Sequence, residues 1–290
     1  MATKKRSVES YTKLPKSFKD ESFYGLSLDE EQLNFVNTAI NPDIDIVFVD
    51  SKAGTGKTTL AVGVANLLVS CGEFSNIIYV VSPYGESKQG YMPGTITEKS
   101  AVYFEAFYQA LEVCGVNPNT AISNENIANQ KNGTGYITCI TDTFLRGSNL
   151  DDAVIILDET QNFTLAQLKK TLTRVCTKVK VIVIGHTLQC DLDKPWLSGF
   201  AKCIEHFKDQ PRAAVCKLTT NHRSWISRWA DELDDRQVIK PANPYDENVV
   251  YTSKRHEGRF SNYIFTNVDD VIDLPLIKDK ETHEKADDTD

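Results

Sequence analysis

Apolar positions recur along the chain in two alternating patterns, and each pattern predicts one type of element. Short apolar runs of strand length occupy residues 44–49, 77–81, 136–140, 154–157, 179–184 and 215–218. Between them, apolar residues at helical spacing cover residues 28–40, 57–70, 100–113, 164–173 and 222–233. Continuous apolar strands that alternate with helices are typical of a mostly parallel sheet with helices on both faces. We therefore predict the α/β class.

Finer features of three predicted helices give further expectations. Ser27, with Glu30 three residues later, predicts a capping box at the start of the first helix. Aromatic residues at 103–108 are expected to pack in the core. Trp225 and Trp229 are four residues apart and share a helix face. A stacking platform for nucleic-acid bases and a core-facing stripe both fit this pair, and we favour the stripe.

The two ends of the chain differ in composition from the segment between them. Residues 1–20 are rich in lysine, which predicts a flexible basic arm. Residues 21–240 hold the predicted strands and helices and are expected to form the main domain. Residues 241–290 end in charged sequence with almost no apolar side chains, so we expect a C-terminal extension with a disordered acidic tail.

Composition excludes several classes of protein. The 290 residues are 41% hydrophobic and 25% charged, which excludes a collagen-like or wholly disordered chain. No apolar run approaches the roughly 20 residues that span a bilayer, and no secretory signal follows the N-terminus. Seven scattered cysteines without a CxxC pair predict reduced thiols. We therefore expect a cytoplasmic protein that does not bind membranes, and its net charge of −8 argues against nucleic-acid binding through charge alone.

A glycine-rich turn, SKAGTGKTT, joins the first predicted strand to the next helix. It ends in the GxGK[ST] pattern of a Walker A phosphate loop, whose glycines let backbone N–H groups surround a phosphate at a helix N-terminus. We expect Lys57 to reach the β- and γ-phosphates of ATP and Thr58 to bind Mg²⁺. Ser51 stands where the full pattern has glycine. The predicted nucleotide-binding residues of this turn are Ser51, Lys52, Ala53, Gly54, Thr55, Gly56, Lys57, Thr58 and Thr59.

A second motif, DAVIILDE at residues 152–159, is an apolar strand that ends in two carboxylates. This is the Walker B pattern, in which Asp158 would hold Mg²⁺ and Glu159 would polarise the attacking water. An acidic turn at a strand end is common, so this motif alone is weak evidence for a Walker B strand. The phosphate loop upstream makes the evidence stronger. Because a switch that only binds nucleotide does not need Glu159, its presence favours hydrolysis.

Six sequence blocks in a fixed order resemble the PhoH family of ATP-binding P-loop proteins. The blocks are SKAGTGKT at 51–58, GYMPG at 90–94, LRGS at 145–148, IILDETQN at 155–162, LTR at 172–174 and GHTLQCDL at 185–192. The resemblance runs from about Leu28 to the helix after Arg223 and implies a RecA-like P-loop core. The chain departs from the family pattern at His186, where the family has aspartate, and at Ser82, where it has arginine.

The resemblance implies roles for residues outside the two phosphate-binding motifs. Gln161 and Gln189 would sense the γ-phosphate or order the attacking water. Gln32 would read the adenine edge, with an exposed helical glutamine as the alternative. Arg174 and Arg223 are candidates for neutralising charge in the transition state, supplied by this chain or by a neighbour, with a solvated surface arginine as the alternative.

Three functions remain open at this point. The leading one is an ATPase that uses Mg²⁺. The second is a helicase or translocase on RNA or single-stranded DNA. We expect too few residues after Leu233 for a second RecA-like domain, so a helicase would have to act as an oligomer, and the family resemblance implies a homo-oligomeric ring such as a hexamer. The third is a switch that binds ATP without hydrolysing it.

Overall fold

The computed structural model describes residues 13–19, 21–82, 96–123, 135–142, 150–231, 236–237, 251–253 and 263–265. The chain divides into two compact units, Met1–His222 and Arg223–Asp290. The predicted basic arm lies mostly outside the described residues, as do the GYMPG and LRGS blocks and the acidic tail. No helix in the described part of the chain has both the length and the apolar character needed to span a bilayer.

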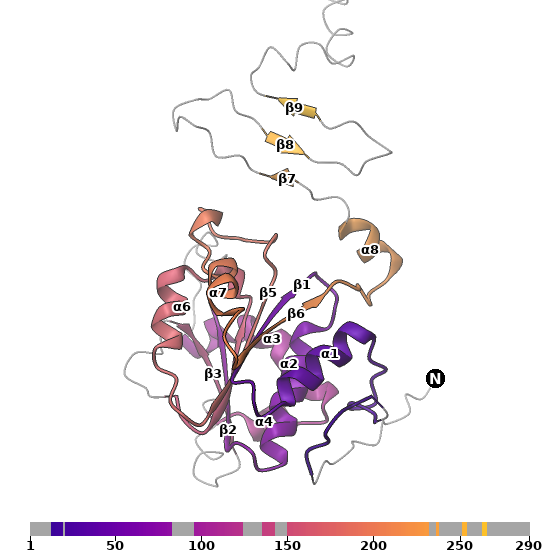
Figure 1. Ribbon diagram of the computed structural model, residues 1–290, viewed down its shortest axis with the longest axis vertical. Helices are drawn as coiled ribbons and strands as arrows, with labels where there is room; N and C mark the ends of the chain where they lie inside the picture. Colours follow the sequence, from indigo (N-terminus) through magenta and orange to yellow (C-terminus); the bar gives the residue numbers. More distant parts are fainter. Residues whose placement is uncertain are drawn as a thin grey trace, which may run out of the picture. The chain divides into compact units, whose positions relative to one another are not determined.

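The first unit is built on a six-stranded sheet in which every neighbouring pair is parallel (Figure 1). Its strands are β1 (Ile46–Ser51), β2 (Asn76–Val81), β3 (Ile137–Thr141), β4 (Ala153–Asp158), β5 (Val179–Gly185) and β6 (Ala213–Leu218). They lie in the order β3-β2-β4-β5-β1-β6. The strand that precedes the phosphate loop is thus separated by one strand from the strand that ends in carboxylates. This is the RecA-like arrangement, and the predicted α/β class is confirmed.

Helices cover both faces of this sheet. They are α1 (Glu30–Ile40), α2 (Lys57–Ser70), α3 (Ile96–Val113), α4 (Pro118–Ala121), α6 (Leu165–Leu172) and α7 (Phe200–Phe207), with short 3-10 turns η2 (Thr160–Asn162) and η3 (Pro195–Leu197). Along β1, Val47 and Val49 belong to the core under α1, α2 and α3, whereas Ile46 and Phe48 belong to the core under α6 and α7. Because both faces are buried, the strand is a continuous apolar run rather than an alternating one.

One local prediction for the first unit is wrong. The N-cap of α1 is Asp29, whose side chain accepts from the backbone N of Gln32, while the Gln32 side chain accepts from the backbone N of Asp29. A capping box therefore forms, but two residues later than Ser27 and Glu30 predict, because aspartate is an equally good N-cap. Helix α7 was not predicted. The prediction that aromatic residues of α3 pack in the core is confirmed, since Phe104 and Phe107 are buried.

The second unit contains helix α8 (Trp225–Asp231) and the strands β7 (Arg236–Gln237), β8 (Tyr251–Ser253) and β9 (Tyr263–Phe265). The strands form an antiparallel sheet in the order β7-β8-β9. Trp225 is 69% exposed and Trp229 is 58% exposed, so the prediction of a core-facing stripe is wrong. Helical spacing puts both rings on one face, but spacing alone does not determine whether that face is covered.

Candidate nucleotide-binding site

The phosphate loop runs from the carboxyl end of β1 to the start of α2. Gly54 has φ +76° and Gly56 has φ +80°, and both angles lie in the left-handed region that glycine adopts without a steric penalty. Gly56 is the N-cap of α2 and supplies no side-chain cap. Ser51 is buried and its hydroxyl donates to the carbonyl of Gly185, 3.2 Å away, so serine fits where the motif usually has glycine.

In this loop, two backbone carbonyls are bonded from outside the loop, whereas the backbone N–H groups are unbonded. Within the described residues, the N–H groups of residues 53–59 donate to no backbone oxygen. By contrast, the carbonyl of Gly54 accepts from the backbone N of His222 at 2.9 Å, and the carbonyl of Thr55 accepts from Nε2 of Gln32 at 3.0 Å. Unpaired backbone donors are costly unless an external acceptor bonds them. The loop is therefore suited to an anion.

Asp158 brings a carboxylate to this loop from the end of β4. It is 1% exposed, and its Oδ2 accepts from the Thr58 hydroxyl at 2.9 Å and from the Tyr79 hydroxyl at 2.8 Å. Burial, together with the negative charge of Glu159, raises the pKa of Asp158 above its usual value. Burial and the adjacent Asp158 raise the pKa of Tyr79 as well, so this hydroxyl keeps its proton and acts as a donor. The two motifs therefore meet at one edge of the sheet.

Glu159 pairs with the loop lysine. Its Oε1 lies 3.0 Å from Nζ of Lys57, and its Oε2 accepts from the amide of Gln161. Burial alone would raise the pKa of Glu159, but the Lys57 ammonium and the Gln161 amide outweigh burial and lower it below its usual value. Glu159 is therefore an ionised carboxylate at neutral pH, and its backbone has φ +50°, which is uncommon for a residue with a side chain.

Gln161 connects the ends of β4 and β5. Besides donating to Glu159, it accepts through Oε1 from the backbone N of His186 at 3.0 Å. Thr160 and Gln161 can approach the end of β5 closely because Gly185 has no side chain. A Cβ at Gly185 would lie 2.6 Å from the Thr160 hydroxyl oxygen. The buried Nδ1 of His186 has no hydrogen-bond partner among the described residues.

The structure does not bring every predicted residue to the cluster of Lys57, Thr58, Asp158 and Glu159. Gln189 is exposed in the turn after β5. The carbonyl of Arg174 accepts from the backbone N of Leu150, which precedes β4, so Arg174 lies at the opposite, amino edge of the sheet. Arg223 is the first residue of the second unit.

Four more predicted nucleotide-binding residues lie outside this cluster and differ in their exposure and contacts. Lys52 is exposed, and its backbone N donates to the carbonyl of Leu218 at 3.0 Å. Ala53 and Thr59 are half-buried. Gln32 is only 7% exposed and is bonded at both ends of its amide, so the alternative of an exposed helical glutamine is wrong.

Sequence reasoning missed Tyr79 and Asp29 as residues that contact the site. Tyr79 stands inside an apolar strand and is stacked on Phe107, with ring centroids 4.2 Å apart, so its sequence context indicates only a core residue. Asp29 and His222 are 193 residues apart, and nothing in their local pattern indicates that Oδ2 of Asp29 and Nε2 of His222 lie 2.8 Å apart.

A family model described as PhoH-like protein matches residues 27–230. The chain belongs to the PhoH family. It is 30% identical over 224 residues to protein PhoH2 of Bacillus subtilis, with 74% of this chain and 49% of that protein covered. It is also 30% identical to protein PhoH of Escherichia coli K12, with 67% and 52% covered. The chain thus spans about half the length of these curated relatives. Family membership supports a P-loop nucleotide-binding protein.

A PhoH-like protein of Bacillus subtilis is 37% identical over 167 residues, which cover 57% of this chain and 49% of that protein. Among solved structures, the large terminase of bacteriophage HK97 aligns with a TM-score of 0.42 and 15% identity, covering 71% of this chain and 42% of that chain.

Proposed function

We propose that the chain binds ATP with Mg²⁺ at the phosphate loop and hydrolyses it. The observation that carries this proposal is the run of unbonded N–H groups at residues 53–59, which includes the backbone N–H of Lys57. A triphosphate supplies the acceptor oxygens that these donors lack within the described chain. Glycine at the two left-handed positions keeps the approach open to the backbone.

The residues present also fit a magnesium ion. Mg²⁺ binds hard oxygen ligands, usually one or two carboxylates or hydroxyls together with phosphate oxygens and water. Asp158 and Thr58 supply such oxygens, and their side chains already lie 2.9 Å apart. When bound, Mg²⁺ would neutralise charge on the phosphates. A bound cation would also favour the ionised form of Asp158, whose pKa burial raises.

Glu159 is the proposed general base. It is ionised, and it can accept a proton from water as that water's oxygen attacks the γ-phosphorus and the bond from phosphorus to the β–γ bridging oxygen breaks, which yields ADP and phosphate. In the structure Lys57 holds Glu159 at 3.0 Å. We propose that the γ-phosphate takes over the Lys57 ammonium and releases the carboxylate for this step. Gln161, bonded to Glu159, would fix its orientation.

The remaining candidates have defined places in this proposal. Gln32 keeps one amide hydrogen and one oxygen lone pair for an adenine edge. Gln189 would order water from its exposed position. Arg174 lies at the amino edge, and the six residues of β4 span about 20 Å, so it would act on the site of a neighbouring copy in a homo-oligomeric ring. Arg223 would neutralise charge in the transition state, either for its own chain or for a neighbouring copy.

A second candidate function is movement along RNA or single-stranded DNA. The observation that favours it is the exposed pair Trp225 and Trp229, because aromatic rings on an accessible helix face can stack on bases. Phosphate release measured with and without RNA and single-stranded DNA distinguishes this function from an ATPase that does not respond to nucleic acid. A switch without hydrolysis would bind ATP and release no phosphate.

The test of the proposed function is phosphate release by the purified chain with ATP and Mg²⁺, together with its mass in solution with and without ATP. We expect release that depends on Mg²⁺ and a mass that exceeds one chain. Binding of ATP without release would favour the switch, and the absence of both binding and release would overturn the proposal.

A further inference from the structure

Two segments far apart in the sequence hold the phosphate loop from its carbonyl side. From the start of α1, Nε2 of Gln32 donates to the carbonyl of Thr55 at 3.0 Å. From the segment after β6, the backbone N of His222 donates to the carbonyl of Gly54 at 2.9 Å. A peptide carbonyl and the next N–H belong to one rigid plane. Fixing these carbonyls therefore fixes the directions of the N–H groups of Thr55 and Gly56.

The same two segments are bonded to each other through Asp29. Its Oδ2 lies 2.8 Å from Nε2 of His222, and its Oδ1 accepts from the backbone N of Gln32 at 2.8 Å. Its own backbone N donates to Oε1 of Gln32 at 3.1 Å. The bonds close a ring from the loop through Gln32, Asp29 and His222 back to the loop. We call Asp29, Gln32 and His222 the loop brace.

A second contact holds the segment after β6 against α1. Both carboxylate oxygens of Glu31 accept from Thr219, one from the backbone N at 2.6 Å and one from the hydroxyl at 2.7 Å. The backbone hydrogen bond from Thr219 lowers the pKa of Glu31, so this carboxylate is ionised at neutral pH. The segment 219–222 is thus fixed at both of its ends, by Glu31 and by Asp29.

His222 is also the last residue of the first unit, and Arg223 begins the second. We propose that Asp29 and His222 are positioning residues that couple nucleotide binding at the phosphate loop to the chain where the second unit begins. The inference rests on the proposed nucleotide binding. Triphosphate oxygens that bond the N–H groups of residues 53–59 polarise and orient the adjoining carbonyls, which Gln32 and His222 hold. Binding at the loop therefore acts on residue 222 directly.

The coupling is reciprocal by thermodynamic necessity. If nucleotide favours one position of His222, then anything that holds His222 in that position raises the affinity for nucleotide. The Asp29–His222 pair is partly solvated, and such pairs add little to stability. Its loss should therefore leave the fold in place and act on nucleotide binding, which separates a positioning role from a merely structural one.

A double-mutant cycle tests the pair. The affinity of the full-length chain for ATPγS with Mg²⁺ is measured by equilibrium dialysis for wild type, Asp29→Asn, His222→Ala and the double variant. Asparagine also caps helices well, so α1 is retained. The effects of mutating two residues that act through one contact do not add. We therefore expect each single change to weaken binding about tenfold. The double change should also weaken it about tenfold, rather than about a hundredfold. The matched control is Lys217→Ala, an exposed side chain on β6, which should bind as wild type does.

The coupling itself is read from Trp225, three residues after His222. Replacing the other tryptophans, as Trp196→Phe and Trp229→Phe, leaves Trp225 as the single tryptophan. We expect a saturable change in its fluorescence on titration with ATPγS and Mg²⁺, and we expect this change to be lost in Asp29→Asn and His222→Ala at nucleotide concentrations that saturate each variant. A full Trp225 response in both variants, or additive effects in the cycle, would overturn the coupling. Absence of any binding to wild type would instead overturn the proposed function.

Discussion

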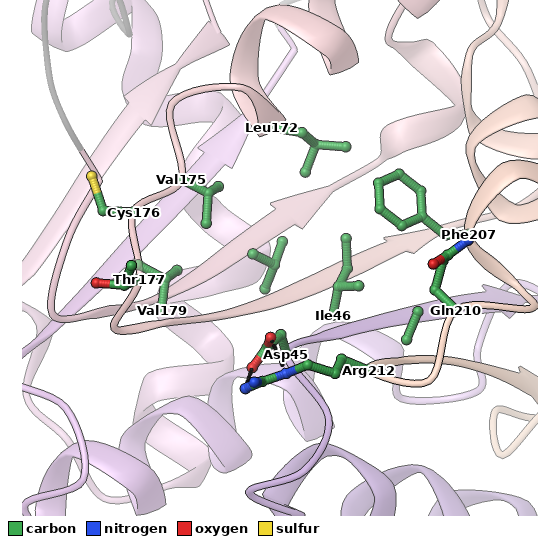
Figure 2. A pocket seen from close by; sticks show the side chains of 12 residues that line it. Asp45, Ile46, Leu172, Val175, Cys176, Thr177, Val179, Phe207, Gln210 and Arg212 are labelled. Atoms are coloured by element: carbon green, nitrogen blue, oxygen red, sulfur yellow. Dashed lines mark hydrogen bonds and ion pairs between the residues drawn. The ribbon is translucent and has the colours of Figure 1, made fainter.

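The two edges of the parallel sheet are built from the same strands but contain different chemistry. At the carboxyl edge, Asp158 and Gln161 are buried and the phosphate loop has unbonded donors. At the amino edge lies a cavity of about 300 Å³ whose walls are mostly apolar, between the starts of β1, β5 and β6 and the ends of α6 and α7 (Figure 2). Its charged residues, Asp45 and Arg212, are exposed and satisfy each other with contacts of 2.6 Å.

This difference shows that a cavity is a weaker indication of function than unsatisfied polar groups. The amino-edge cavity has volume, but its two charged side chains, Asp45 and Arg212, are already bonded to each other. At the carboxyl edge, the Asp158 and Glu159 carboxylates lie beside backbone donors without acceptors, and ligands of α/β sheets bind at carboxyl edges. We therefore assign nucleotide chemistry to the carboxyl edge and none to the amino-edge cavity.

The largest expected effect is at Lys57. Lys57→Ala removes the only side-chain cation that contacts the carboxyl-edge cluster among the described residues, and we expect ATP affinity to fall at least about 100-fold, since the phosphates would lose their charged partner. Equilibrium binding of ATPγS measures it. The amino-edge counterpart, Arg212→Ala, should bind normally. Equal losses in the two variants would contradict the assignment.

The next effect concerns turnover rather than binding. Glu159→Gln keeps the shape of the side chain but removes the base, so we expect phosphate release to fall by about 10²–10⁴-fold while ATP still binds. Single-turnover phosphate release and nucleotide binding are measured on the same preparation. Turnover at the wild-type rate would exclude Glu159 as the base.

A third prediction concerns stability at the amino edge. Lys180 is buried and donates to the carbonyls of Asn41 and Ile44, and burial lowers its pKa to about 8. Below that pH the folded state holds an ammonium that burial disfavours. Between pH 8 and 10.5 the unfolded chain binds more protons than the folded one, so stability rises with pH. Relative to Lys180→Met, wild type should gain roughly 2–3 kcal/mol over this range.

Urea denaturation at pH 7.5 and pH 10 measures this difference, since other titrating groups are common to both proteins and cancel. A constant difference in the free energy of unfolding at the two pH values would show that Lys180 has an ordinary pKa.

The smallest effect is expected for the ion pair at the cavity. Exposed pairs contribute about 0–1 kcal/mol, so Arg212→Ala should change the free energy of unfolding by less than about 1 kcal/mol and leave phosphate release unchanged. Chemical denaturation and the ATPase assay measure both. A marked loss of ATPase activity would mean that the amino edge takes part in the chemistry.

Much of the carboxyl edge could be predicted from sequence because its signals are local. Glycines of the phosphate loop and the apolar strand that ends at Asp158 indicate their elements directly, and α2 begins and ends where the pattern predicts, at Lys57 and Ser70. Helix α7 also had a local signal, Phe200, Cys203 and Phe207 at helical spacing, which sequence reasoning overlooked.

Other features depend on contacts between distant residues, and no local pattern contains them. The pairing of Asp29 with His222 and the role of Tyr79 as a donor to Asp158 arise only when the strands assemble. The same holds for Arg174, whose place at the amino edge follows from the bridge between Leu150 and Val175. The sequence indicates that Arg174 is a candidate for neutralising charge in the transition state, but it does not determine at which edge of the sheet Arg174 lies.

The most direct test of the central claim is hydrogen–deuterium exchange at residues 53–59 of the full-length chain, measured with and without ATPγS and Mg²⁺. The account predicts that these backbone N–H groups exchange readily alone and become protected when nucleotide binds, with no protection in Lys57→Ala. Nucleotide binding that leaves residues 53–59 unprotected, or that protects the amino-edge cavity instead, would contradict it.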